Sequence, residues 1–213
     1  MGLIKQGNST TFTKIDGIIK LIVDEINNDQ EIKRLLTYLT KDPLANISYS
    51  YDNKKYYQRD LTRNLLKDEI IDVSKLQDGS IKIDSKAPLY HYGWCDEKIS
   101  YEYPNVFVSH IQSQSNLIGK STFKISILVP FDYIDLYEMG DRGHKILERI
   151  SYLFNKTRTD KESSEVLGDL EFEVGKAVEG KIANSKSISI IEVPIYVILV
   201  NDRIENGRMV ENA

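Results

Sequence analysis

The first pattern of apolar and polar positions covers residues 14–39. Isoleucines recur there at intervals of three and four residues, which is typical of a helix with one buried face. A second apolar stripe follows Asn28, which we expect to cap a new helix while Glu31 reaches back to complete a capping box. Pro43 marks its end, because the residue before a proline avoids helical backbone. The pattern predicts an αα-hairpin or one kinked helix.

Alternation of apolar and polar positions predicts two strands, at 105–111 and 121–129, paired across the polar loop "QSQSNLIGK". Pairing is expected to stop at Pro130, which has no N–H to donate to a sheet ladder. Asp141 then carries the side chain of a helix N-cap. The apolar positions after it predict a helix over 142–154 that packs back across the sheet.

The last apolar run, "SISIIEVPIYVILV" (187–200), differs from an ordinary half-buried strand. Its second half is apolar on both faces, which in a sheet indicates cover on both sides. The helix over 142–154 can cover one face, and we assign the other face to a neighbouring copy of the chain. Pro194 indicates a bulge or an unpaired edge. The best candidates for the subunit contact are Tyr196, Ile198 and Val200, on the face opposite Ile195, Val197 and Leu199.

Other segments give shorter patterns. Residues 170–174 alternate as a half-exposed strand, whereas "NKTRTDKESSE" (155–165) is expected to be a solvated loop. Residues 61–73 are compatible with a short helix, and the Asp78-Gly79 pair predicts a hairpin.

Together these elements predict an α+β fold. It has an antiparallel or mixed β-sheet, an N-terminal helical hairpin and one helix packed across the sheet. We expect one domain over 1–200, with a long tyrosine-rich insert at about 46–104. Residues 201–213 are polar and are expected to form a flexible tail.

Length and composition are those of a soluble globular protein. The chain has 213 residues, of which 41% are hydrophobic and 28% charged, and a net charge of −4. This balance argues against a dominant role in binding phosphates, which relies on clustered lysine and arginine. No apolar run reaches the roughly 18 residues of a membrane span, and the N-terminus lacks the apolar core of a signal peptide. We therefore expect a protein made in a cytoplasm, with no membrane contact.

Candidate catalytic chemistry is sparse. His91 and Cys95 stand four apart in "HYGWC", but a zinc site needs three or four ligands and no second pair stands at ligand spacing. We expect His110 to be a strand residue on a polar side and His144 to lie in the first turn of a helix, facing solvent. The sequence contains no nucleophile elbow and no phosphate-binding glycine loop. We therefore expect no enzyme activity, no cofactor and no metal.

A tyrosine-rich and basic stretch at 49–67 supports two interpretations. Aromatic rings beside cations are used by single-stranded nucleic-acid binders. Tyrosine and arginine are also favoured anchors of protein interfaces, and this interpretation suits an acidic chain better. We assign Tyr56, Tyr57 and Arg59 to a subunit interface, and keep a single-stranded nucleic-acid-binding module as the alternative.

The order of segments resembles the neck and tail-completion (tail-terminator) proteins of tailed bacteriophages. The residues that carry the resemblance are "LLTYLTKDPL" (35–44), "ISILVPFDY" with "RGHKILERISYLF" (125–154), and the final strand. They cover about half of the chain, and all are packing patterns rather than catalytic motifs. The insert has no counterpart in the resemblance.

The resemblance implies a small α/β subunit of a virion, forming a closed homo-oligomeric ring, a hexamer or dodecamer, at the head–tail joint. Ring closure needs head-to-tail contacts between copies. It also implies neighbouring neck, portal or tail-tube proteins as partners, and a channel through which DNA passes without specific binding. A mildly acidic chain suits such a channel, because a strongly cationic lining would hold the phosphates.

Overall fold

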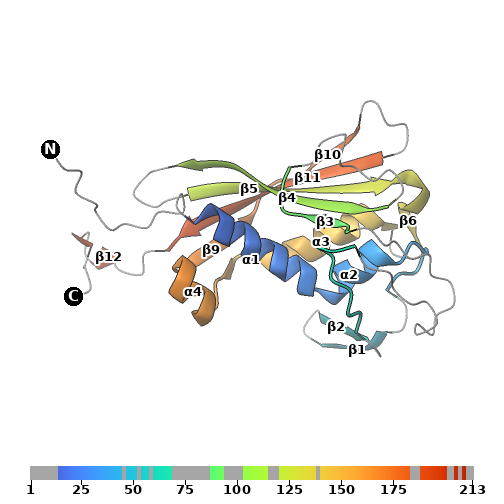
Figure 1. Ribbon diagram of the computed structural model, residues 1–213, viewed down its shortest axis with the longest axis horizontal. Helices are drawn as coiled ribbons and strands as arrows, with labels where there is room; N and C mark the ends of the chain where they lie inside the picture. Colours follow the sequence, from blue (N-terminus) through green and yellow to red (C-terminus); the bar gives the residue numbers. More distant parts are fainter. Residues whose placement is uncertain are drawn as a thin grey trace.

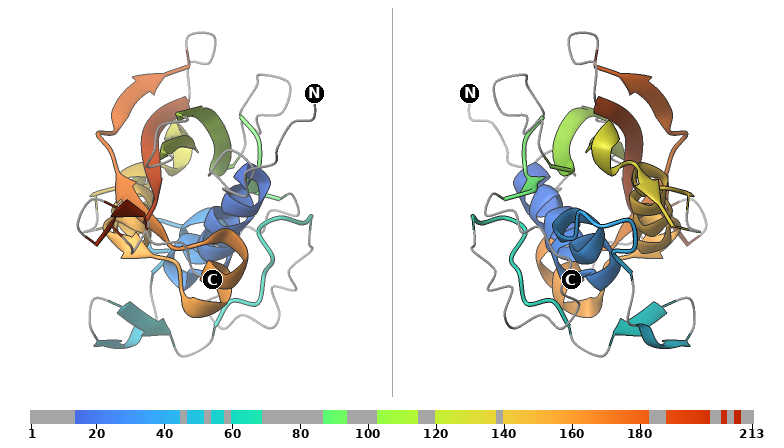
Figure 2. Two further views of the ribbon diagram at one scale, coloured as in Figure 1. Left: turned by 90° about the vertical axis from the view of Figure 1, so that its left-hand side faces the viewer. Right: turned by 90° about the vertical axis from the view of Figure 1, so that its right-hand side faces the viewer.

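The computed structural model describes residues 14–44, 47–51, 54–57, 60–68, 87–93, 103–114, 120–137, 140–182, 188–200, 204–205 and 208–209. It has the predicted α+β architecture, with a mixed sheet that curls over a layer of helices (Figures 1 and 2). The Asp78-Gly79 hairpin and Cys95 lie outside these residues.

The main sheet is seven-stranded, in the order β3-β4-β5-β11-β9-β8, with β10 also paired to β11. Among its described pairs only β3–β4 is parallel, and the others are antiparallel. The strands are β3 (Leu89–Tyr90), β4 (Asn105–Gln114), β5 (Lys120–Pro130), β8 (Thr157–Arg158), β9 (Leu170–Val174), β10 (Val178–Lys181) and β11 (Ile188–Leu199).

The predicted strand pair is confirmed. β4 and β5 run antiparallel from the pair Asn105–Leu128 onward, with a bulge between His110 and Gln112. β5 ends at Pro130, where the missing N–H was expected to stop the ladder.

At Pro194 one edge of β11 has no described ladder partner, in line with the unpaired edge predicted from the proline's inability to donate a hydrogen bond. On one edge of β11, residues 189–192 pair with residues 178–181 of β10, and β9 pairs from Ile195 onward. Between them the amide of Gly175 donates to the Pro194 carbonyl at 2.8 Å. The bend between β9 and β10 therefore lies opposite the proline.

Helices cover the inner, concave face of the sheet (Figure 1). The two N-terminal helices are α1 (Ile15–Asn28) and α2 (Gln30–Thr37), and α3 (Arg142–Phe154) packs across β5, β9 and β11. The core between the layers consists of aliphatic and phenylalanine side chains. Each such side chain stabilises the fold by roughly 1.5–3 kcal/mol when fully buried. Fully buried members (0% exposed) include Ile22, Ile26, Phe123, Ile125, Ile150, Val193, Ile195 and Val197.

The break between α1 and α2 is one residue later than predicted. Asp29, not Asn28, is the N-cap, and its carboxylate accepts a hydrogen bond from the Ile32 amide at 2.9 Å. The other oxygen of Asp29 accepts from Arg149 Nε at 2.8 Å, in an ion pair whose side chains are 5% and 8% exposed. Asn28 is the last residue of α1. Asp29 both caps α2 and pairs with Arg149 of α3.

The helix predicted after Asp141 is confirmed. Asp141 caps α3 by accepting from the His144 amide at 3.0 Å. The apolar face of α3 is buried or packed against the core, as its spacing predicted. Its members are Ile146, Leu147, Ile150, Leu153 and Phe154.

The solvated loop expected at 155–165 is wrong in part. It contains β8 and the start of a fourth helix, α4 (Lys161–Leu167), whose N-cap Asp160 accepts from the Ser163 amide at 2.7 Å. Leu167 alone among the α4 residues is buried, so the helix has no apolar stripe to reveal it.

Two parts of the predicted insert belong to the main body. Leu65 and Leu89 lie in the core, and the Leu89 amide donates to the Leu65 carbonyl at 3.1 Å. Asn27 of α1 accepts from the Leu65 amide at 2.8 Å. Residues 60–68 contain only a turn, so the described part of the helix considered over 61–73 is not helical.

Three small hairpins complete the described elements: β1 (Ile47–Tyr51) with β2 (Lys54–Tyr57), β6 (Asp135–Leu136) with β7 (Gly140–Asp141), and β12 (Ile204–Glu205) with β13 (Arg208–Met209). A 3-10 turn, η3 (Phe131–Tyr133), leads from β5 to β6.

A fully buried arginine ties several of these parts together. Arg142, at the start of α3, is 0% exposed and donates to four backbone carbonyls. Its acceptors are Tyr133 at 2.7 Å, Leu35 at 2.6 Å, Tyr38 at 2.8 Å and Thr40 at 2.6 Å. Burial lowers the pKa of Arg142 to about 10, and the nearby Asp141 carboxylate opposes that shift. The guanidinium thus satisfies carbonyls at the C-terminal end of α2.

Candidate functional site

The outer, convex face of β11 is the candidate subunit contact. Side chains of β11 alternate: Val193, Ile195 and Val197 point into the helical core, and the residues between them point outward. The outward row begins at Ile188 and passes Glu192 and Pro194 before it reaches Tyr196 and Ile198.

The first half of this row is covered by the chain itself. Ile188 and Ile190 are buried in a second apolar cluster with Phe107, Leu128 and Ile182. The ring of Tyr90 stacks on Phe107 with centroids 4.6 Å apart. The chain itself therefore covers Ile188 and Ile190, and the predicted contact between copies concerns the second half of the strand.

The middle of the row is polar. Glu192 accepts from Lys124 Nζ at 2.7 Å and from the Ser126 hydroxyl at 3.2 Å, both on β5. The charged pair separates the covered cluster from the second half of the strand.

The second half carries the predicted contact residues. Tyr196, Ile198 and Val200 are half-buried, on the face opposite the buried Ile195 and Val197. We call these three residues the β11 stripe.

Charged strands flank the β11 stripe on both sides. On β9, Glu173 lies opposite Tyr196 and Glu171 opposite Ile198. On β5, Lys120 lies opposite Ile198, and its ammonium group is 4.2 Å from the centroid of the Tyr196 ring. An apolar row between a carboxylate edge and an ammonium edge is a surface suited to protein contact.

The geometry of the β11 stripe depends on Gly175, which the sequence analysis did not single out. A Cβ on this residue would lie 2.7 Å from Pro194 Cγ and 2.8 Å from Tyr196 Cε2. The close approach of the β9–β10 bend therefore sets the position of the Tyr196 ring. Glycine at the end of an alternating strand was the available signal.

No described contact joins the other predicted contact residues to the β11 stripe. Tyr56 and Tyr57 belong to β2, of which only the backbone is described, and Arg59 lies outside the described residues. Arg63, one of the cations considered for nucleic-acid stacking, is 2% exposed and donates to the Thr37 hydroxyl at 3.2 Å. It holds residues 60–68 against α2.

The histidines occupy three unrelated places. His91 is exposed, and its possible partner Cys95 lies outside the described residues. His110 is in β4, but its ring packs edge-on against the buried Phe123, with centroids 5.3 Å apart, so the expected polar side is wrong. Its Nε2 lies 2.8 Å from Ser113 Oγ, so this ring nitrogen has a hydrogen-bond partner.

His144 lies in the first turn of α3 and is exposed, as expected. Its Nε2 is 2.7 Å from Glu179 Oε1 on β10, and its Nδ1 is 3.4 Å from Asp141 Oδ1. The hydrogen bond to Glu179 raises the pKa of His144. Burial lowers this pKa in part, and the negative charges of Asp141 and Glu179 raise it further.

A cleft of about 490 Å³ lies beside α1. Ile19, Val23 and Leu66 form its apolar part, and His91 and the Lys20–Asp24 ion pair contribute polar groups. Nowhere in the part of the chain that the structure describes do three or more potential metal ligands come together. None of the described helices has the length and apolar content to span a membrane.

Comparison with known proteins adds no assignment. No protein-family model matches the chain, and no curated protein matches it.

Proposed function

We propose that this chain is a structural subunit of a tailed-bacteriophage particle, which forms a homo-oligomeric ring at the head–tail joint. Neighbouring neck, portal or tail-tube proteins are its partners, and DNA passes through the ring without specific binding. The family assignment rests on the resemblance of segment order in the sequence. The contact between copies rests on the β11 stripe.

The observation that carries the proposal is the contrast between the two faces of β11. The inner face is closed by helices, and the first half of the outer face by the second apolar cluster. Tyr196, Ile198 and Val200 are only half-buried. Tyrosine and isoleucine in a row gain free energy when a second protein surface removes their remaining area from water.

The flanking charges favour a head-to-tail contact. The β11 stripe has Glu173 and the Glu171–Arg158 ion pair on one side and Lys120 on the other, so the two sides differ in charge. A contact that uses a different patch on each copy closes into a ring when the rotation between copies is suitable.

Electron microscopy of the purified full chain tests the ring. We expect closed rings with a central hole, and none when Ile198 is replaced by Asp. Antibody against the chain should label the head–tail joint of particles from the phage that encodes it. Absence of rings over the accessible concentration range, together with unlabelled particles, would overturn the proposal.

A further inference from the structure

Strand β10 lies at the rim of the main sheet (Figures 1 and 2). All four of its residues are exposed, and Val178 is 64% exposed. Among the described strands it pairs with β11 alone, so its second edge has no described ladder. Such an edge presents backbone N–H and C=O groups that another strand can pair with.

The sequence of β10 is complementary to itself when read antiparallel. With Gly180 opposite Gly180 of a second copy, Glu179 lies opposite Lys181, and Lys181 lies opposite Glu179. Val178 then lies opposite Ile182. We propose that two copies of the chain pair through β10 about a two-fold axis and so join their sheets into one.

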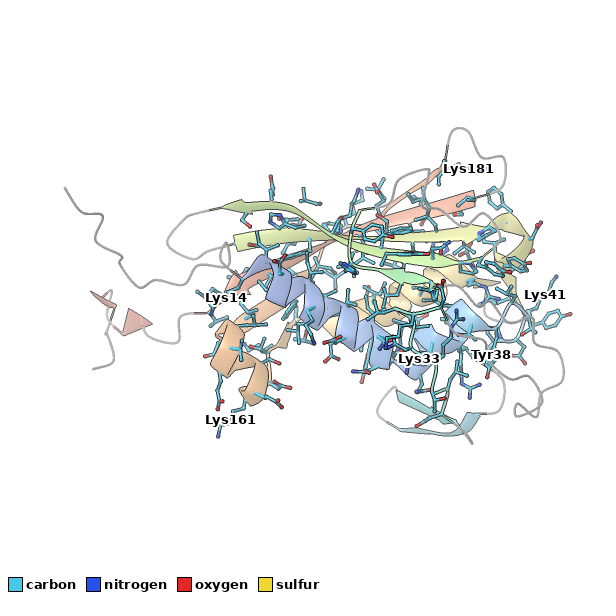
Figure 3. All side chains as sticks on the ribbon, in the orientation of Figure 1. Lys14, Lys33, Tyr38, Lys41, Lys161 and Lys181 are labelled. Atoms are coloured by element: carbon cyan, nitrogen blue, oxygen red, sulfur yellow. The ribbon has the colours of Figure 1, made fainter. Side chains whose placement is uncertain are left out.

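The side chains of β10 are placed for this register. Glu179 and Lys181 pair with Ile191 and Ser189 of β11, and so share one face of the sheet. Residues directly opposite in an antiparallel pair share a face, so each carboxylate meets an ammonium group on the same side. Figure 3 shows Lys181 at the rim of the sheet.

The contacts that these side chains make within one copy are compatible with pairing. Glu179 uses Oε1 for His144, and its other carboxylate oxygen can accept from Lys181 of the second copy. The Lys181 ammonium lies 5.1 Å from the Phe131 ring centroid, at the end of a long side chain that can turn toward a carboxylate. Gly180 adds no side chain at the centre, so the two backbones can approach closely.

A short edge strand with a lysine is also a common defence against pairing. The defence works by like-charge repulsion, which needs one sign of charge along the edge. In β10 a glutamate and a lysine stand on either side of Gly180. In the antiparallel register each glutamate therefore lies opposite a lysine of the other copy, which gives two attractive pairs. This is why the surface fits a second copy of the chain rather than an unrelated strand.

The two-fold contact does not depend on the proposed ring, because β10 and the β11 stripe are different surfaces. A two-fold contact uses the same patch on both copies and stops at a dimer. Combined with a ring, it would join two rings face to face.

Sedimentation velocity of the full chain tests the contact in the Ile198→Asp background, which removes any contribution of the β11 stripe. We expect a dimer whose dissociation constant rises about tenfold or more in Glu179→Lys and in Lys181→Glu, since like charges then lie directly opposite. An equimolar mixture of these two variants should form a heterodimer, because the two lysines on the β10 edge of one copy then oppose the two glutamates on that of the other.

His144→Ala is the control for Glu179, since it removes the hydrogen bond within the copy and leaves the edge charges in place. It should still dimerise, and circular dichroism should show that all variants are folded. Three results would each overturn the proposal: an Ile198→Asp protein with no dimer at any accessible concentration, β10 variants in that background that dimerise as well as Ile198→Asp alone, or a mixture that yields no heterodimer.

Discussion

At the scale of single residues, Arg142 shows how one side chain can hold a fold. Its five N–H groups form a rigid fork, and here the fork meets carbonyls from α2, the segment after it and η3. The charge is buried, yet these four hydrogen bonds go to carbonyl oxygens rather than to a carboxylate. The helix end thus supplies the negative partial charge that balances the guanidinium.

Replacing Arg142 by Met leaves four carbonyl contacts unmade, so we expect a loss of about 3 kcal/mol or more in the free energy of unfolding, measured in urea. Arg158→Met is the matched control, because Arg158 is 60% exposed in its pair with Glu171 and should contribute less than about 1 kcal/mol. Equal losses in the two variants would contradict the assigned role.

The pKa of His144 should depend on its hydrogen bond to Glu179 of β10. The hydrogen bond to Glu179 raises that pKa above the ordinary 6.5, so the contact stabilises the fold fully below pH 6.5 and is lost as pH rises through the folded value. Proton NMR should find the His144 pKa above 6.5 in the wild type and lower in Glu179→Gln. An identical pKa in both proteins would show that the contact does not form.

At the scale of elements, the bend between β9 and β10 positions the β11 stripe. Gly175→Ala should destabilise the fold by about 1–3 kcal/mol, because the added methyl group meets both Pro194 and Tyr196 below 3 Å. Gly180→Ala is the control, since its Cβ would lie 3.5 Å from Ile190 Cγ2, an ordinary contact. Thermal unfolding measures both, and similar melting temperatures for the two variants would contradict the packing described for Gly175.

The strongly periodic elements could be predicted from the sequence. The α1, α3, β5 and β11 patterns come from side chains that face one core, and a buried face imposes its period on the sequence. The effects of Pro130 and Pro194 on strand pairing could also be predicted, because each proline lacks a backbone N–H donor in any surroundings.

The elements that the sequence did not predict lack a repeated pattern of buried residues. All four residues of β10 are exposed, and the strand is defined only by its pairing with β11. In α4 only Leu167 is buried, and the cap Asp160 was the one available signal. β3 has two residues and depends on its parallel pairing with β4.

The candidate site was predicted only in part for a similar reason. Alternation in β11 placed Tyr196, Ile198 and Val200 on the face opposite the core. The closure of Ile188 and Ile190 by Phe107 and Leu128 depends on residues far apart in the sequence. Periodicity within one strand carries no information about such distant partners.

At the scale of the whole molecule, the helices close one side of the curled sheet. On the other side of β11, the described residues bury Ile188 and Ile190 and leave Tyr196, Ile198 and Val200 half-buried. This division predicts different effects of the same substitution on the two faces of β11. Ile195→Asp buries a charge at a position 0% exposed and should cost more than about 4 kcal/mol of unfolding free energy. Ile198→Asp, at a half-buried position, should cost about 1 kcal/mol, as urea unfolding of dilute samples would measure. An equal cost at both positions would mean that Ile198 belongs to the core.

Native mass spectrometry of the full chain tests most directly whether the β11 stripe joins copies. The wild type should give one closed oligomer of more than two copies of the 24.5 kDa chain. Ile198→Asp should give no species larger than a dimer, with an unchanged circular dichroism spectrum. A wild type that never exceeds two copies, or an Ile198→Asp variant with the same oligomer as the wild type, would contradict the account.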